Sequence, residues 1–298
     1  MKRYVTGGIL VLLMAALLWD NQVAAQAVRD GLALCARSVI PSLFPFFVAV
    51  SCFTALGLAD ACGRLLSPVM GPLLGCSGTG SAAFLLGLLG GYPVGGRTVG
   101  QLYESGAIDR GEAEHLLAFC NNCGPSFVLG IAGVGCFGST RMGVYLYLIH
   151  VTAAVLVAQL HRRPNALPSH LPARPPAPPL TVAFIRSVTA GAQTMVHVCA
   201  FVVFFLVALR LMVCHTGLSN PVVIGTIELT GGILRLQPDR GGFLAAAGLL
   251  GWGGLSVHCQ TAAVLRDSGL SLRSCVTGKL LQAAISVILA ALVSRWIF

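Results

Sequence analysis

Charged residues are scarce in this chain: only 10% of its 298 residues are Asp, Glu, Lys or Arg. A soluble domain carries about 25% charged residues, so this chain has too little polar surface to cover a water-exposed globule. Apolar runs long enough to cross a bilayer recur from end to end. Because these runs are continuous rather than alternating, we expect helical spans and not a barrel. The composition therefore predicts an all-α, polytopic protein of the cell membrane, with the lipid bilayer as its surroundings.

Acidic residues are absent from the long stretch between Glu114 and Glu228, where arginines continue to occur. Basic residues beside spans mark cytoplasmic loops. The net charge of +9 is therefore interpreted as loop asymmetry and not as nucleic-acid binding. Residues 161–180 hold seven of the fifteen prolines and no acid, which predicts a basic, Pro-rich, semi-rigid cytoplasmic linker.

Motifs for catalysis and metal binding are also missing. The chain has neither an H-E-x-x-H pair nor a G-x-S-x-G elbow. Its eleven cysteines show no disulfide framework, and most lie within or beside apolar runs, where they act as small hydrophobes. We expect no enzyme activity, no cofactor and no metal. The alternative is a thiol oxidoreductase or intramembrane enzyme built on the C-x-x-C of Cys120 and Cys123.

Candidate spans cover about 5–25, 39–58, 81–96, 124–139, 142–160, 192–214, 221–236, 242–257 and 276–294. We interpret residues 1–28 as an uncleaved N-terminal transmembrane segment rather than as a signal peptide. Several spans are short and contain Gly or Pro, which predicts broken or re-entrant helices. A cytoplasmic N-terminus and linker require one of the first five to be re-entrant, either the one ending at Tyr92-Pro93 or the one starting at Pro125.

The regions on either side of the linker, 29–160 and 181–298, resemble each other. The first contains "GLLGGYPVGG" followed by "RTVGQLYESG", and the second contains "GLLGWGG" followed by "QTAAVLRDSG". Their shared order predicts two repeated membrane halves, although low-complexity apolar sequence could also produce such similarity. Repeats with broken helices in matching positions are typical of secondary transporters, whose sites lie where the halves meet.

Polar groups at these breaks are the candidate solute-binding residues. The stretch Gly90–Val99 cannot form a regular helix, and its helix resumes with a positive end near Arg97. A tight packing site of small residues is the competing interpretation. Glu228 stands out as a carboxylate inside an apolar run, although a position at the membrane boundary is the alternative. The candidates are Tyr92, Pro93, Gly95, Gly96, Arg97, Thr98, Asn121, Asn122, Glu228, Ser256 and Gln260.

The stretch "AFCNNCGPSF", Ala118–Phe127, follows a short helix that Asp109 and Glu112 are expected to cap. We predict a hairpin tip there. Its amides, Asn121 and Asn122, can satisfy freed backbone groups or a solute. The two cysteines are then bystanders.

Four motifs in order, "VIPSLFPFFV", "GGYPVGGRTVGQLYESGAI", "EAEHLLAFCNNCGPSFVLG" and "IELTGG", resemble the YlbJ family of sporulation integral membrane proteins. The resemblance runs from about Gly31 to the C-terminus. It places the chain in the Gate, or nucleoside-recognition, group. It implies a membrane protein of sporulating cells needed for spore cortex formation. A transporter or channel for a small polar solute is expected, and a non-transporting assembly factor is the alternative. Further expected partners are a second copy or other sporulation membrane proteins.

Overall fold

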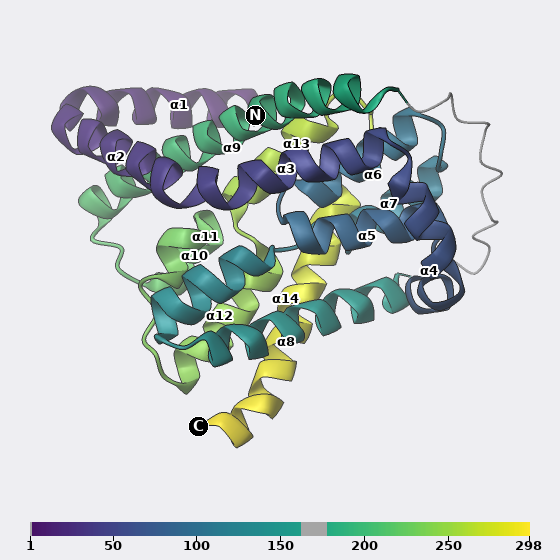
Figure 1. Ribbon diagram of the computed structural model, residues 1–298. Coiled ribbons are helices and arrows are strands. Elements are labelled where there is room, and N and C mark those ends of the chain that lie inside the picture. The colour runs from purple at the N-terminus through teal and green to yellow at the C-terminus, as the bar shows by residue number, and fades with distance from the viewer. Residues whose placement is uncertain (1, 162–177) are drawn as a thin grey trace.

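The computed structural model describes residues 2–161 and 178–298, and within them every regular element is a helix (Figure 1). The predicted linker, 161–180, lies outside the described residues apart from its two ends. The helices are α1 (Lys2–Trp19), α2 (Asn21–Leu34), α3 (Ile40–Ala55), α4 (Leu58–Leu74), α5 (Gly78–Gly90), α6 (Val94–Glu104), α7 (Arg110–Leu117), α8 (Thr140–Leu160), α9 (Leu180–Thr216), α10 (Pro221–Ile227), α11 (Leu229–Ile233), α12 (Arg240–Trp252), α13 (Leu255–Leu265) and α14 (Arg273–Ile297), with π-helical stretches η1 (Cys35–Val39) and η2 (Ser126–Cys136).

Four helical stretches are long and apolar enough to cross a membrane: 140–160, 180–216, 240–265 and 273–297. The number rises to six if two bent helix pairs each count as one span. The all-α membrane fold with broken helices is thus confirmed. The π-helix η2, with 11 residues, and α5, with 13, are each shorter than a crossing of about 20 residues.

Two predicted spans differ from the structure. The N-terminal segment 5–25 is not one helix, because α1 ends at Trp19 and the chain bends by 97° before α2. Asp20 at this bend pairs with His215 of α9, at 2.6 Å between carboxylate and imidazole. The expected span 221–236 is instead the short helices α10 and α11, which Glu228 separates.

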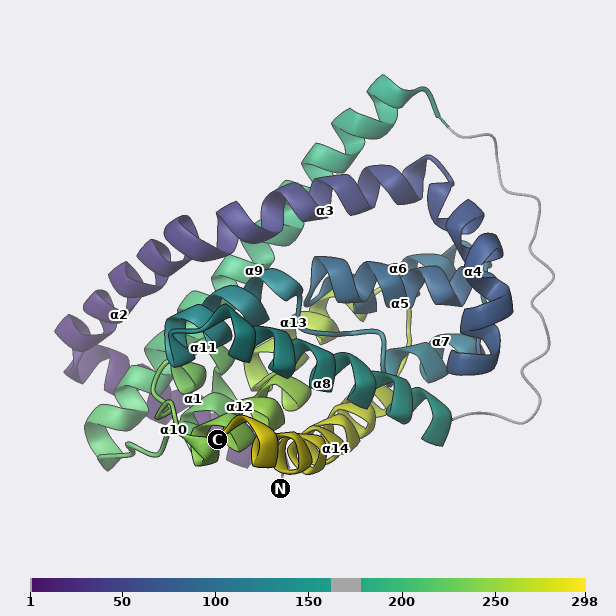
Figure 2. The same ribbon diagram turned by 60° about the horizontal axis from the view of Figure 1, so that its bottom comes forward.

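The helices form layers around a central pair. Helices α2 and α3 continue into each other through η1 along one side, and α9 crosses them (Figures 1 and 2). On the opposite side α14 packs against α12 and α8. The resumed halves of the two broken helices, α6 and α13, contact each other between these layers. The breaks themselves therefore lie inside the molecule and not on its lipid-facing surface.

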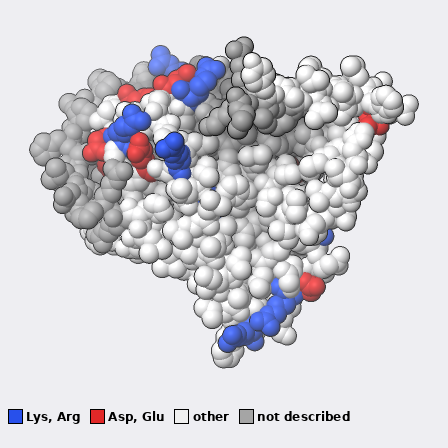
Figure 3. Space-filling view, turned by 180° about the vertical axis from the view of Figure 1, so that it is seen from behind, with Lys and Arg blue, Asp and Glu red and all other residues white. Residues whose placement is uncertain are grey.

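Charged side chains gather near two opposite ends of the face shown in Figure 3, with a broad uncharged zone between them. Helix α14 begins at Arg273, after the exposed pair Arg266 and Asp267, and ends beside Arg295. At about 1.5 Å per residue its 25 residues span roughly 37 Å, enough for a hydrocarbon core of about 30 Å. The distribution of charge fits a membrane belt.

The structure contains matching features at corresponding positions of the two halves, in agreement with the predicted repeat. Gly91 and Gly254 both have positive φ with extended ψ, a conformation that favours glycine, just before a helix resumes. The hydroxyls of Thr98 and Thr261 each donate to the carbonyl one turn earlier, at Val94 and Val257. The two members of each pair are separated by the same number of residues. Shared geometry, and not composition alone, therefore supports the similarity between the two halves. The domain boundaries remain predictions.

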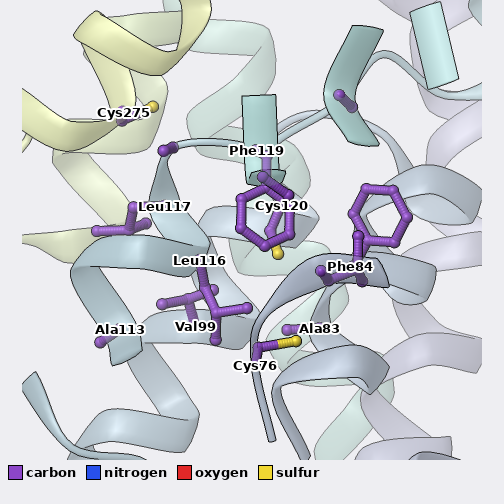
Figure 4. Close-up of a cluster of buried hydrophobic side chains, with 14 of the residues drawn as sticks. Cys76, Ala83, Phe84, Val99, Ala113, Leu116, Leu117, Phe119, Cys120 and Cys275 are labelled. Atoms are coloured by element: carbon purple, nitrogen blue, oxygen red, sulfur yellow. The ribbon is translucent and has the colours of Figure 1, made fainter. Parts of the chain in front are cut away.

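The segment Ala118–Pro125 is not a hairpin tip. A turn at Ala118 and Phe119 leads into irregular chain that runs through the interior as far as Gly124, and all these residues are buried. Helix resumes at Pro125. Figure 4 shows Phe119 and Cys120 within an apolar cluster that also includes Leu116 and Phe84. Helices α5, α6 and α14 approach this "extended segment" (118–125) so closely that a Cβ on Gly95 would collide with the Cys120 carbonyl oxygen.

Helix α7 directly precedes this segment. Asp109 caps α7 by accepting a hydrogen bond from the Glu112 amide at 2.7 Å, as predicted. The Glu112 carboxylate, however, accepts from the Ser77 amide at 2.6 Å and so joins α7 to the start of α5. The N-terminus of α5 thus finds a side-chain acceptor on α7.

Candidate functional site

The two helix breaks meet at Tyr92. Its hydroxyl donates to the Leu250 carbonyl, at 2.9 Å, across the interface between the halves. A Cβ on Gly253 would lie 3.0 Å from the Tyr92 hydroxyl oxygen, so the second break is fitted to the side chain of the first. The structure therefore brings the breaks together, as expected for a site between repeats.

A cavity of about 170 Å³ lies beside this contact, and we call it the central cavity. Four predicted solute-binding residues line it: Tyr92, Glu228, Ser256 and Gln260. They come from both halves and from three separate helix breaks or helix starts. The Gln260 amide nitrogen donates to the Ser256 hydroxyl at 3.3 Å. The rest of its wall is mostly apolar: Leu34, Val39, Leu43, Cys123, Phe127, Ile131, Val198, Val202, Leu229 and Val257.

Glu228 has a structural role besides lining the cavity. It is 4% exposed, and its two carboxylate oxygens accept hydrogen bonds from the amides of Thr230 and Gly231, at 3.0 and 2.6 Å. Glu228 therefore caps the start of α11 with its side chain. The side chain is thus buried inside the protein beside the cavity, and its depth relative to the membrane boundary stays a prediction.

Asn121 joins the two resumed helices and does not face the central cavity. Its oxygen accepts from the Gly96 amide at 3.3 Å, and its nitrogen donates to the Thr261 hydroxyl at 2.7 Å. One side chain of the extended segment therefore bridges α6 and α13. Without it, the Gly96 amide would lose its side-chain acceptor inside the protein.

The other candidates near Tyr92 have packing roles. The Arg97 guanidinium donates to the Ala190 carbonyl at 3.2 Å and also to the Thr194 hydroxyl, so it fastens α6 to α9. Gly96 contacts α13, where a Cβ would lie 3.0 Å from the Thr261 methyl carbon. Pro93 caps the start of α6. Of the two interpretations of Gly90–Val99, close packing fits Gly95, Gly96, Arg97 and Thr98, whereas Tyr92 and the neighbouring Gly91 line the cavity.

A second polar group lies next to Tyr92 and is called the Lys279 cluster. It consists of Lys279 and Gln282 of α14, Asn122 of the extended segment and His150 of α8. Of its members, Asn122 was a candidate from the sequence and the other three were missed. Lys279 is 1% exposed, and its ammonium donates to the Gln282 side-chain oxygen at 2.7 Å and to the Asn122 oxygen at 3.4 Å. The ammonium also lies 5.3 Å from the centre of the Tyr92 ring.

His150 completes this cluster as an acceptor. Its Nε2 accepts from the Cys123 amide at 3.1 Å, and its backbone carbonyl accepts from the Gln282 amide nitrogen at 3.1 Å. A lysine inside an apolar run, with Gln282 one turn later, was a visible signal, because it follows the rule that singled out Glu228. The partners in space, Asn122 and His150, could not be inferred from spacing.

The cysteines Cys120 and Cys123 are both buried and free. No group of three or more His, Cys, Asp or Glu side chains suited to a metal occurs among the described residues. Cys123 lines the central cavity, whereas Cys120 belongs to the apolar cluster of Figure 4. The arrangement offers polar groups for binding.

Comparison with known proteins agrees with the resemblance inferred from the motifs. Residues 36–157 match the family model described as Gate: Nucleoside recognition. The chain is also similar to the sporulation integral membrane protein YlbJ of Bacillus subtilis (strain 168), with 26% identity over 94% of this chain and 80% of the relative. No solved structure matches it significantly. The two matches confirm the predicted resemblance to the YlbJ family and to the Gate group.

Proposed function

We propose, on the premise that the chain is a YlbJ-like integral membrane protein with a Gate region, that it carries a small polar solute across the cell membrane during sporulation. The solute binds in the central cavity. On this proposal the protein crosses the membrane several times, performs no catalytic step and contributes to spore cortex formation.

The central cavity is the observation that carries the proposal. Four of its polar residues, Tyr92, Glu228, Ser256 and Gln260, were candidates from the sequence, and the rest of the wall is mostly apolar. Few polar groups in an apolar pocket are typical of small-molecule sites. A volume of about 170 Å³ suits a small solute, since cavities of about 150 Å³ hold a benzene-sized molecule.

The position of the cavity supports transport of the solute. It lies where the breaks of two repeated helix pairs meet, which is the location of substrate sites in many transporters. Since Tyr92 bridges to Leu250, a shift of one half against the other would change both this bond and the cavity wall.

The test is to fill the cavity and measure sporulation. The chain would be produced in a B. subtilis strain lacking YlbJ, and heat-resistant spores would be counted. We expect Ser256→Phe to abolish the spores, because the ring occupies the space of the solute. Leu255→Phe is the matched control, since Leu255 is 46% exposed on the outer side and should retain function.

Two readouts accompany the spore count. Immunoblotting of membranes must show equal amounts of both variants, so that a folding defect is recognised. Vesicles containing the purified protein would be loaded with a small-molecule extract of sporulating cells, and mass spectrometry would identify what leaves them. Full spore yield for Ser256→Phe at a normal protein level would contradict transport and favour the assembly role.

A further inference from the structure

We propose that the Lys279 ammonium is a tethered monovalent cation, occupying a cation site that Asn122, Gln282 and Tyr92 form. The site follows from the geometry of the described residues alone. Only its consequence for transport, that carriage needs no Na⁺, rests on the proposed function. In many carriers, unwound backbone near the substrate coordinates a mobile Na⁺ or H⁺. Here the chain supplies the cation itself.

The ammonium donates to two amide oxygens and makes a cation–π contact with an aromatic ring. Gln282 Oε1 lies 2.7 Å from Nζ, Asn122 Oδ1 lies 3.4 Å from it, and the centre of the Tyr92 ring lies 5.3 Å away. An ammonium has three N–H groups and no acceptor. A cation within about 6 Å of an aromatic ring centre is attracted by the ring face. The surroundings thus fit the charged form of Lys279.

The two amide oxygens face Lys279 because other bonds use the amide nitrogens. Gln282 Nε2 donates to the His150 carbonyl and to Asn122 Oδ1, both at 3.1 Å. Asn122 Nδ2 donates to the Phe119 carbonyl at 2.6 Å. These bonds fix the orientation of both amides. The site therefore keeps its oxygens directed inward whether or not the ammonium is present.

Neutral oxygens, and not a carboxylate, surround this charge. Among the described residues, the two buried carboxylates are Glu112 and Glu228, and backbone amides at helix starts bind both. A buried charge is costly unless it is paired or coordinated. Rings of neutral oxygens replace the hydration shell of monovalent cations in ion channels. The donor set resembles a cation site more than an ion pair.

The site lies directly behind the wall of the central cavity. Tyr92 lines the cavity, and its ring lies next to the ammonium. On this proposal, a fixed positive charge lies next to the Tyr92 ring that lines the cavity of the bound solute. Because the charge is covalently held, binding it costs no ordering of a free ion.

Chemical rescue tests the site. Lys279→Ala removes a fragment equivalent to n-propylammonium and leaves the acceptors in place. We expect the unfolding temperature of the purified full-length variant to fall by roughly 10 °C. Millimolar n-propylammonium chloride should restore at least half of that loss. The comparison uses n-propanol at the same concentration, with choline chloride to match the ionic strength. Propanol fills the same space without charge and should restore little.

Two further variants serve as controls. Lys279→Met fills the space with an apolar chain, so it should be destabilised and should not respond to n-propylammonium. Leu280→Ala, at a neighbouring position 56% exposed on the same helix, should show no difference between the two compounds. If Lys279→Ala gives no folded protein, the yield of monodisperse protein prepared with n-propylammonium is compared with the yield prepared with propanol.

Specific outcomes overturn the proposal. Equal rescue by propanol, or rescue by neither compound, would mean that the site does not select a cation. A wild-type protein whose unfolding temperature rises in Na⁺ but not in choline would hold a mobile ion instead. None of these measurements involves transport. A failure of the proposed function would therefore leave the rescue intact, and a failed rescue would leave the spore assay unaffected.

Discussion

After its broken helix pair, the first half ends α7 at Leu117 and continues without regular structure as far as Gly124, whereas the second half continues as the unbroken α14. The two regions start alike, since α7 begins at Arg110 and α14 at the corresponding Arg273. Residues explain the divergence: Asn-Asn and Gly-Pro interrupt the first, while "KLLQAAISVILAAL" contains no Gly or Pro.

The difference shows how non-helical chain is tolerated inside a membrane protein. Freed backbone groups must find partners where no lipid can supply them. In the extended segment, the Cys123 amide donates to His150 and the Phe119 carbonyl accepts from Asn122. The continuous helix contributes Lys279 and Gln282 to the same place. Helix is interrupted in the first half, and α14 of the second half supplies polar side chains that face the interruption.

The largest effect is expected from separating the two regions. Gly278 of α14 lies against the backbone of Ala118, where a Cβ would collide with the carbonyl oxygen. Gly278→Val should therefore cost about 4 kcal/mol or more and remove most protein from the membrane. Gly130→Ala is the control, because nothing lies within 4 Å of its added Cβ. Immunoblotting of membranes measures both, and equal levels would contradict the close contact.

Removing the polar link between the regions should have the next largest effect. Asn122→Leu leaves Lys279 with one amide oxygen and leaves the Phe119 carbonyl without its side-chain donor. We expect a loss of about 3 kcal/mol in unfolding free energy. Thermal unfolding of purified protein measures it. The effect should shrink in a Lys279→Met background, because the ammonium is then absent, and equal effects in both backgrounds would mean that the residues are not coupled.

A smaller effect is expected at the bridge between the resumed helices. Asn121→Ala and Thr261→Val should each destabilise the protein, and the double variant should recover about 1 kcal/mol of the summed loss. Thr98→Val provides the comparison. Its hydroxyl bonds only within α6 among the contacts described, so it should show no coupling to Asn121→Ala. Additive losses for Asn121 and Thr261 would exclude the bridge.

The smallest expected effect is a pH dependence of the unfolding temperature that arises in α7 of the first half. Burial lowers the pKa of His115, whose Nε2 lies 2.8 Å from the Leu74 carbonyl oxygen. Folding therefore favours the neutral imidazole of His115. Its contribution to the stability of the folded protein is present above the ordinary pKa of histidine and is lost as pH falls. The unfolding temperature should drop from about pH 7.5 to about pH 5.5, less so in His115→Gln. An unchanged pH profile in this variant would assign the drop elsewhere.

The sequence by itself determined that this is a helical membrane protein with interrupted spans. Its low charge and long apolar runs leave no other fold class. Gly90-Gly91 with Pro93, and Gly253-Gly254, set the two breaks near Tyr92 and Gly253. The repeat was also visible, because Thr98 and Thr261 occupy matching positions. Four residues of the central cavity were identified on this basis.

The tertiary structure decided which polar groups share a site. Asn121 and Asn122 are adjacent in sequence, yet one bridges α6 to Thr261 and the other contacts Lys279. Arg97 was assigned to the solute by its position, but it contacts α9. The Asn121 and Asn122 side chains of this irregular segment reach different helices, so their partners depend on which helices pack around the segment. That packing joins residues far apart in sequence, which local pattern cannot reveal.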